Sequence, residues 1–496
     1  MVTGIARFPS HPLVHSWLRP LRIAWVPGTL EPLVGRVADG LLACLRRHGH
    51  ELQDRPTDDT DALLTSTGSE EVLPWRQALM FTAHRRFGLR RIPTVFTLTA
   101  MHPDRFAALM ARFSTALAKE PPDPDDFRFP GLAPNAARVF LEQGHRGGAI
   151  LALERLLQAQ AKCLRIILTI GADKPVCAYH FDLVGASAQT LQQDPEAFAE
   201  DLALRIATAV STREVNRHQV LPNPIPIATW QALSTPLAMR EASRQLAARH
   251  FFTEMVRIAD LVQVPAVGAA IASQYSEGCF ATWEPALGGL VATITGSARP
   301  VDKGRLTDDD LAVIAGLRAD GLGALVRHVE GKTNLPPSSE AVEMLLMDQG
   351  LPAVTIPGPD GQPLWVPVMR SKLHGHRGVR AYDPRRVEYT PVAAPFQHYP
   401  VSCGTEAQAL AIREAFARSQ ALREPSDPRS VVFTILPGHG VVIVEKWVPG
   451  KAPFQAVWEA MDDGAIEIES LVPQGPFGFS PSPDGKCRLA REDDAP

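Results

Sequence analysis

Three histidines in the last third of the chain have the type and spacing of a metal site. His374 and His376 are separated by one residue, so on a β-strand both imidazoles would lie on the same face. His439 lies between Gly438 and Gly440, immediately before a run of β-branched residues, where backbone can approach closely. Three protein ligands with one open position are typical of catalytic zinc. The sequence therefore predicts a site for Zn²⁺ or another divalent metal ion.

A glutamate upstream of these histidines has the type needed for acid–base chemistry. Glu340 follows Pro337-Ser338-Ser339 and precedes an apolar stretch with helical spacing. A carboxylate beside a metal can move protons while the metal, as a Lewis acid, stabilises charge on a carbonyl oxygen. The alternative is that Glu340 only begins the helix, capped by Ser338 or Ser339.

A cluster of tyrosines follows the histidine pair. Tyr382, Tyr389 and Tyr399 are three of the five tyrosines in the chain. One hydroxyl could supply a proton on the side opposite Glu340, and Tyr382 is the candidate we name. The alternative is a packed ring whose hydroxyl reaches water.

A second His-x-His pair serves as an internal comparison. His48-Gly49-His50 follows a stretch, 31–47, with apolar residues at helical spacing and Arg46 and Arg47 in its last turn. Gly49 is where a helix commonly ends, so we interpret this pair as a helix terminus. The run Asp308-Asp309-Asp310 is likewise interpreted as a turn and the N-terminus of a helix.

The elements that must position these residues form two domains, because 496 residues exceed the roughly 250–300 that one core supports. A proline-rich stretch predicts domains over 1–236 and 237–496. Strands and helices alternate in the first, which predicts an open, mostly parallel α/β sheet. The predicted strands are 21–26, 62–66, 94–98 and 164–170, and the predicted helices are 31–47, 74–86, 103–118 and 149–161.

The second domain is predicted to be α/β as well. A helical region runs from 238 past 262, with Leu246, Phe251, Met255, Ile258 and Leu261 on an apolar stripe. Short strands and one further helix follow, predicted at 290–294, 364–368, 431–436 and 441–444 for the strands and at 405–418 for the helix.

The composition excludes some classes of partner. A net charge of −4 with 21% charged residues gives no reason to expect nucleic-acid or anionic-membrane binding. The sequence contains no apolar run near the ~20 residues that span a bilayer. Six scattered cysteines fit reduced thiols better than a disulfide framework, so we expect a cytoplasmic protein.

The order of these motifs resembles the class II aldolase/adducin family, over the chain from Ala238 onward. The motifs are Asp302-Lys303-Gly304 with Leu306-Thr307, then Pro337-Ser338-Ser339-Glu340, His374-Gly375-His376 and His439-Gly440. The resemblance implies an αβα domain and assembly as a homo-oligomer, usually a tetramer.

Residue by residue, the resemblance makes Glu340 the acid–base residue and His374, His376 and His439 the zinc ligands. It also implies that Thr295, Gly296, Ser338 and Ser339 line a pocket for a phosphate or carboxylate. Gly278-Cys279-Phe280-Ala281 stands where the family has a G-N-x-S phosphate-binding turn, so the sequence leaves open whether the substrate is phosphorylated.

These observations favour a zinc-dependent carbon–carbon lyase that acts on a small hydroxylated or acidic carbonyl compound. One alternative is a metal-dependent sugar isomerase or epimerase. Glu277 and Glu284 form an acidic pair of the kind such enzymes use, and the N-terminal half faintly resembles the first domain of fucose or arabinose isomerases. Another alternative is a non-catalytic, adducin-like binding protein.

Overall fold

The computed structural model of the chain divides into two compact units. The first is made of Met1–Thr212 and Met255–Tyr275, and the second of Arg213–Glu254 and Ser276–Pro496. The residues that the structure describes are 20–28, 30, 32–67, 88–89, 94–101, 108, 115, 164–171, 174–182, 185–190, 195–211, 215–252, 278–295, 303–358, 361–393, 396–397, 404–437, 439–469, 472–473 and 477–490.

The division between the units falls nearer residue 212 than residue 236, where the prolines predicted it. The short strand β8 (Gln219–Val220) explains the difference, because it pairs in parallel with β12 (Ala324–Arg327) of the second unit. The proline-rich stretch that follows β8 therefore lies inside the second unit.

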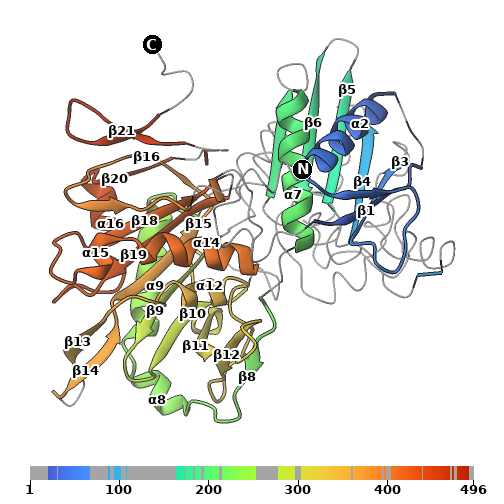
Figure 1. Cartoon of the computed structure of the whole chain (residues 1–496). Helices are drawn as coiled ribbons and strands as arrows, with labels where there is room; N and C mark the ends of the chain where they lie inside the picture. Colours follow the sequence, from blue (N-terminus) through green and yellow to red (C-terminus); the bar gives the residue numbers. More distant parts are fainter. Residues whose placement is uncertain are drawn as a thin grey trace. The chain divides into compact units, whose positions relative to one another are not determined.

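The first unit contains helices and a mostly parallel sheet, as the alternating pattern predicts. Strands β2, β1, β3, β4 and β5 run parallel, and β6 and β7 add an antiparallel edge (Figure 1). In spatial order the described strands are β2 (Glu51–Gln53), β1 (Arg22–Trp25), β3 (Ala62–Thr67), β4 (Thr94–Met101), β5 (Leu164–Gly171), β6 (Lys174–Asp182) and β7 (Gly185–Thr190). The helices predicted at 74–86, 103–118 and 149–161 lie almost wholly outside the described residues.

Helix α2 (Pro32–Arg47) confirms the interpretation of the first His-Gly-His pair. Proline at the first helical position and arginines in the last turn suit the two ends of the helix. Gly49 has φ 84°, a left-handed conformation that ends helices and costs glycine little. His48 Nε2 then lies 2.6 Å from a Glu200 carboxylate oxygen on α7 (Pro195–Ser211), so this histidine ties two helices together.

The second unit is built on a large, mostly antiparallel sheet (Figure 1). Among the described residues its strands lie in the order β17 (Val387–Tyr389), β18 (Val431–Leu436), β19 (Gly440–Lys446), β15 (Met369–Gly375), β9 (Cys279–Glu284), β10 (Gly289–Thr293), β11 (Leu311–Leu317), β12 and β8. The predicted strands at 290–294, 431–436 and 441–444 are thus confirmed, and β-branched residues fill them because both faces are covered.

Helices cover the two faces of this sheet differently. On one face, α9 (Thr235–Ala248) and α16 (Gln455–Asp462) pack over a core that includes Phe280 and Leu373. On the other face, α12 (Ala341–Leu346) and α14 (Glu406–Ala417) pack against each other. Because side chains alternate along a strand, Leu373 points toward the first pair of helices and His374 toward the second.

Helix α9 is shorter than predicted. It ends at Ala248, and His250 adopts a left-handed backbone with φ 56° that stops the helix without a glycine or proline. Leu246 is buried on α9 as predicted, whereas Phe251 is buried from the turn beyond it. The rest of the predicted stripe lies outside the described residues.

The acidic run at 308–310 also differs from its prediction. It forms a short 3₁₀ helix, η4 (Asp308–Asp310), in which Thr307 and Asp310 make a capping box. Strand β11, rather than an α-helix, follows directly, since Leu311 already has extended backbone.

Smaller elements surround the large sheet. Strands β13 (Ala353–Pro357) and β14 (Pro363–Pro367) form a hairpin, and β14 is the strand predicted at 364–368. A further sheet has the order β20 (Ile466–Glu469), β16 (Gly378–Tyr382), β22 (Cys487–Leu489) and β21 (Phe479–Pro481). Two short helices, α8 (Ile227–Ala232) and α15 (Gln420–Arg423), complete the described elements.

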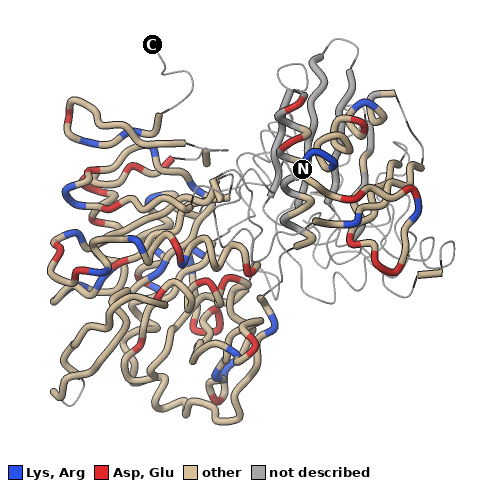
Figure 2. The backbone as a smooth tube through the Cα atoms, in the orientation of Figure 1, with Lys and Arg blue, Asp and Glu red and all other residues tan. Residues whose placement is uncertain are grey.

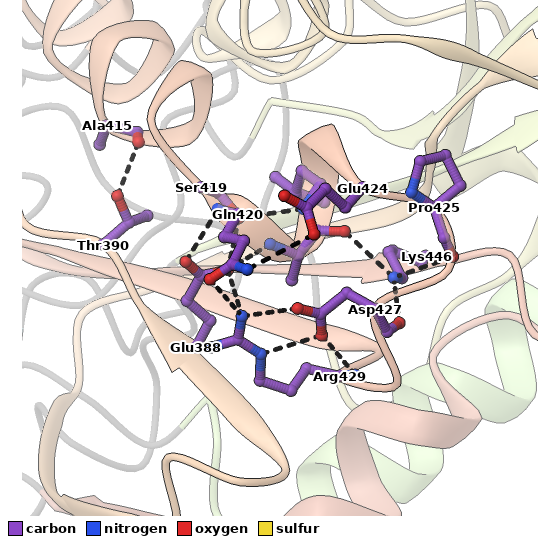
Figure 3. A network of polar contacts seen from close by, with 12 residues as sticks. Glu388, Thr390, Ala415, Ser419, Gln420, Glu424, Pro425, Asp427, Arg429 and Lys446 are labelled. Carbon is purple, nitrogen blue, oxygen red and sulfur yellow. Dashed lines mark hydrogen bonds and ion pairs between the residues drawn. The ribbon is translucent and has the colours of Figure 1, made fainter.

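A polar network lies at the β17 edge of the sheet (Figure 3). The Glu388 carboxylate accepts hydrogen bonds from Ser419 Oγ at 2.7 Å and from the backbone N–H of Gln420 at 2.9 Å, which satisfies the N-terminus of α15. The Arg429 guanidinium lowers the pKa of Asp427 to about 2. Lys446 of β19 donates to the Asp427 carbonyl, so the network joins β17, α15 and β19.

Charged residues of both signs are interspersed along the described part of the second unit (Figure 2). No helix among the described residues is long and apolar enough to cross a membrane.

Candidate metal centre

The structure brings the three predicted histidines together. His374, His376 and His439 each offer one ring nitrogen, and these nitrogens lie within 4.8 Å of one another. The ring centroids are 4.9–5.1 Å apart in pairs, with the rings steeply inclined to each other. Three imidazoles so arranged can hold a metal ion, and three nitrogen ligands leave a further position for a substrate or water.

Sheet register explains how residues far apart in sequence meet here. His374 is the penultimate residue of β15, and His376 is the first residue after Gly375 ends that strand. His439 lies in the turn that joins β18 to β19, with its N–H donating to the Leu436 carbonyl at 3.0 Å. Antiparallel pairing of β15 with β19 then brings the end of one strand beside the start of the other.

Glycines allow this close approach. A Cβ placed on Gly440 would lie 2.2 Å from the Gly375 carbonyl oxygen, and one on Gly375 would lie 2.4 Å from the Phe251 ring. Gly278 has φ 92°, and a Cβ there would lie 2.4 Å from the His374 carbonyl oxygen. The prediction that a glycine beside His439 permits close backbone contact is confirmed for Gly440.

The ring nitrogens of His374 and the state of His376 suit metal binding. His374 Nδ1 lies 3.1 Å from the Val441 carbonyl oxygen, which fixes the proton on Nδ1 and turns Nε2 toward the other rings. His374 Nε2 is buried and makes no hydrogen bond to the described residues, although a Glu340 carboxylate oxygen lies 3.2 Å from it. Burial lowers the pKa of His376 to about 4, so this ring is neutral at pH 7. A buried nitrogen that lacks a hydrogen bond is what a metal-ligating imidazole presents before the ion binds.

Glu340 lies beside the histidines, as the sequence predicts. It is 5% exposed, and its Oε1 lies 3.2 Å from His374 Nε2 and 4.0 Å from His439 Nε2. Glu340 is also the N-cap residue of α12, but its side chain makes no capping hydrogen bond to the helix. The carboxylate is therefore directed to the candidate metal centre and not to the helix end.

Two residues that the sequence analysis did not assign hold the Glu340 carboxylate in place. Cys279 Sγ donates to Oε2 at 2.7 Å, and Gln408 Nε2 of α14 donates to Oε1 at 3.2 Å. Burial, and then the Glu340 charge, raise the pKa of the Cys279 thiol well above its usual range, so the thiol keeps its proton. Cys279 faces His374 across the β9–β15 pairing, a position visible only once the register is known.

A second carboxylate, Glu343, lies one helical turn beyond Glu340 and was also missed. It is 1% exposed, and burial followed by the Glu340 charge raises its pKa well above the usual range. The Gly404 N–H, a nearby donor, is engaged by Gln408 Oε1 at 3.0 Å. The only sequence signal was the helical spacing of Glu340 and Glu343, which places them on one side of α12.

The structure describes three of the four residues predicted to bind a substrate anion, namely Thr295, Ser338 and Ser339. Ser338 and Ser339 directly precede Glu340. The Thr295 N–H donates to the Pro336 carbonyl and the Ser338 N–H to the Thr293 carbonyl, each at 3.0 Å, so the two segments run side by side. Ser338 Oγ accepts the Glu340 N–H at 3.4 Å. Ser339 is partly exposed in the same turn, and Gly296 lies outside the described residues.

Tyr382 lies in an aromatic cluster rather than among the histidines. Its ring packs edge-on against Phe433 and Phe479 with centroids 5.3 and 5.2 Å away. Burial, followed by the neighbouring Cys487 thiol, raises the pKa of Tyr382 above its usual value. These contacts agree with the alternative given in the sequence analysis, in which Tyr382 is a packed ring and not a proton donor.

Of the acidic pair Glu277 and Glu284, which motivated the isomerase alternative, the structure describes only Glu284. Glu284 is at the opposite end of β9 from Cys279, where it accepts hydrogen bonds from Thr235 Oγ1 at 2.5 Å and the Ala286 N–H at 2.8 Å. Glu277 lies outside the described residues. Glu284 thus joins α9 to the sheet.

No family model, no curated protein and no solved structure significantly matches this chain.

Proposed function

We propose that this chain is a zinc-dependent carbon–carbon lyase of the class II aldolase type, acting on a small hydroxylated or acidic carbonyl compound. The observation that carries the proposal is the convergence of His374, His376 and His439 with the Glu340 carboxylate in one buried place. Sheet register and helix packing, rather than sequence proximity, produce that convergence.

The donor set fits a divalent transition metal. Three imidazoles suit Zn²⁺, and their nitrogens lie within 4.8 Å of one another. A metal held there would supply Lewis acidity toward a carbonyl group. Zinc is the proposed identity because it favours low coordination numbers and nitrogen ligands.

Glu340 is the proposed acid–base residue. Hydrogen bonds from Cys279 and Gln408 occupy one position on each carboxylate oxygen and fix its orientation. Oε1 nevertheless stays 3.2 Å from His374 Nε2, so the carboxylate can take a proton from, or return it to, a substrate bound beside the histidines. Thr295, Ser338 and Ser339 are the proposed contacts for an anionic group of the substrate.

An assay of carbon–carbon cleavage tests this function. The zinc-loaded chain is incubated with short hydroxylated ketones and hydroxy-keto acids, with and without phosphate, and the products are followed by mass spectrometry. We expect cleavage into two carbonyl-containing fragments. A Glu340→Gln chain should keep its metal and lose about 10²- to 10⁴-fold in rate.

The same assay separates the lyase from the isomerase alternative, because isomerisation conserves the number of carbon atoms. Products of unchanged mass would favour the isomerase or epimerase. A zinc-loaded chain that converts none of these compounds, and whose Glu340→Gln variant behaves identically, would contradict the lyase proposal and favour the binding protein. Cytoplasmic location and assembly as a homo-oligomer stay predictions.

A further inference from the structure

Glu343 is a buried carboxylate that the proposed chemistry does not use. It belongs to α12 and is 1% exposed. Its side chain lines one small cavity together with Glu340, His374, Cys279 and Gln408. Two carboxylates and a candidate metal ligand therefore line one small pocket with residues of α12, α14 and the sheet.

The oxygens of Glu343 are unsatisfied there. Both are buried and neither accepts a hydrogen bond from the described residues, although the nearby Gly404 N–H, which donates to Gln408 Oε1, partly opposes the rise in the pKa of Glu343. The other polar side chains of this cavity are engaged, since Cys279 and Gln408 both donate to Glu340 and His374 Nδ1 bonds the backbone. A buried carboxylate without partners is costly, and a native protein retains one where a function needs it.

The buried lysine on the adjacent strand does not compensate Glu343. Lys372 lies two residues before His374 and is fully buried. Its ammonium pairs with the Asp348 carboxylate and donates to the Met344 carbonyl oxygen. The charge of Lys372 is thus already balanced by another carboxylate.

Charge balance identifies a cation that would satisfy Glu343. Neutral imidazoles add no charge, so a divalent ion bound by the histidines and faced by Glu340 alone would leave one positive charge in a buried place. Such an excess is unfavourable in a medium of low dielectric constant. Glu343, in the cavity that His374 and Glu340 also line, supplies a second negative charge near the ion and offsets the excess, and the ion offsets the repulsion between the carboxylates.

We propose that Glu343 is a second carboxylate of the metal centre, which balances the charge of the bound divalent ion together with Glu340 and thereby raises the affinity for that ion. This inference rests on the proposed metal-dependent function. It assigns Glu343 a role through charge, without direct contact with the reacting atoms.

The test measures two quantities on the full chain. The affinity for Zn²⁺ alone is determined by competition with a chromophoric chelator, and the melting temperature is determined without metal. Glu343→Gln keeps the shape of the side chain and removes its charge. We expect zinc to bind about 10- to 100-fold more weakly, with a melting temperature of the metal-free chain that is unchanged or higher.

Glu445→Gln is the matched control. Glu445 is equally buried, at 1% exposure, but accepts hydrogen bonds from Ser371 Oγ and from the N–H groups of Phe454 and Ala456. Its replacement should lower the melting temperature of the metal-free chain and leave zinc affinity unchanged. Glu343→Gln is thus expected to weaken zinc binding without lowering the melting temperature, and Glu445→Gln to lower the melting temperature without weakening zinc binding.

The outcomes separate this inference from the function on which it rests. Wild-type protein that binds no zinc overturns both. Wild-type protein that binds zinc no more tightly than Glu343→Gln overturns only the role of Glu343. If Glu343→Gln does not fold, Glu343→Met is measured instead, and failure of both to fold shows that the carboxylate stabilises the metal-free chain, which also overturns the inference.

Discussion

Gly440→Ala tests whether the close pairing of β15 with β19 sets the geometry of the histidines. The new Cβ would lie 2.2 Å from the Gly375 carbonyl oxygen and 3.0 Å from His376 Cα. An ordinary contact is longer by about 1 Å or more, so the two strands must separate by that amount. The separation would move His439 away from His376, because each histidine adjoins one of these glycines.

Two consequences of Gly440→Ala can be measured. Overpacking of this kind costs about 1–3 kcal/mol of stability, which chemical denaturation detects. Loss of support for a metal ligand weakens metal binding by about 10- to 100-fold, which a chelator competition with Zn²⁺ detects. Gly316→Ala is the control, since Gly316 lies in β11 of the same sheet and a Cβ there meets open space. Equal zinc affinity in the two variants would refute the reasoning.

Three further predictions concern the rest of the chain. Burial lowers the pKa of His50 from 6.5 to about 4, so between these pH values the unfolded chain binds more protons than the folded chain. The contribution of His50 to the free energy of unfolding is therefore fully present above about pH 6.5 and should fall by roughly 2–3 kcal/mol as the pH approaches 4. Denaturation of His50→Gln should not show this loss. Lys372→Met should cost about 3–5 kcal/mol by leaving Asp348 unpaired, whereas Lys372→Met/Asp348→Leu should be far less destabilising, and similar stability of the two would contradict the buried ion pair. Tyr382→Phe keeps the aromatic packing, so zinc binding and turnover should be unchanged, and loss of turnover alone would restore the proton-donor role.

Local patterns predicted the elements of this chain well where one segment determines its own structure. The apolar spacing and terminal arginines specify α2, and the β-branched runs specify β18 and β19. The spacing of the histidines predicted the candidate centre. The histidines meet in the structure because β15 and β19, the two strands beside which they lie, pair directly. Glu340 was predicted from its Pro-Ser-Ser-Glu motif at the start of an apolar stretch with helical spacing, and its carboxylate lies 3.2 Å from His374 Nε2.

Contacts between distant segments could not be predicted in this way. Cys279 faces His374 only because β9 pairs with β15 in one register, and a shift of one residue would turn the thiol away. Gln408 reaches Glu340 from α14 because that helix packs on α12. Helix α9 ends early because the backbone of His250 is left-handed, a conformation that a histidine at this position does not predict.

The most direct test of the central claim is the metal content of the purified full chain by elemental mass spectrometry. The account predicts about one zinc ion per chain in the wild type and none in a His374→Ala/His376→Ala variant. His48→Gln changes the other His-Gly-His pair, which joins α2 to α7, and should leave the zinc content unchanged. A wild-type chain that holds no divalent metal even after reconstitution, or a double variant that keeps its zinc, would contradict the metal centre described above.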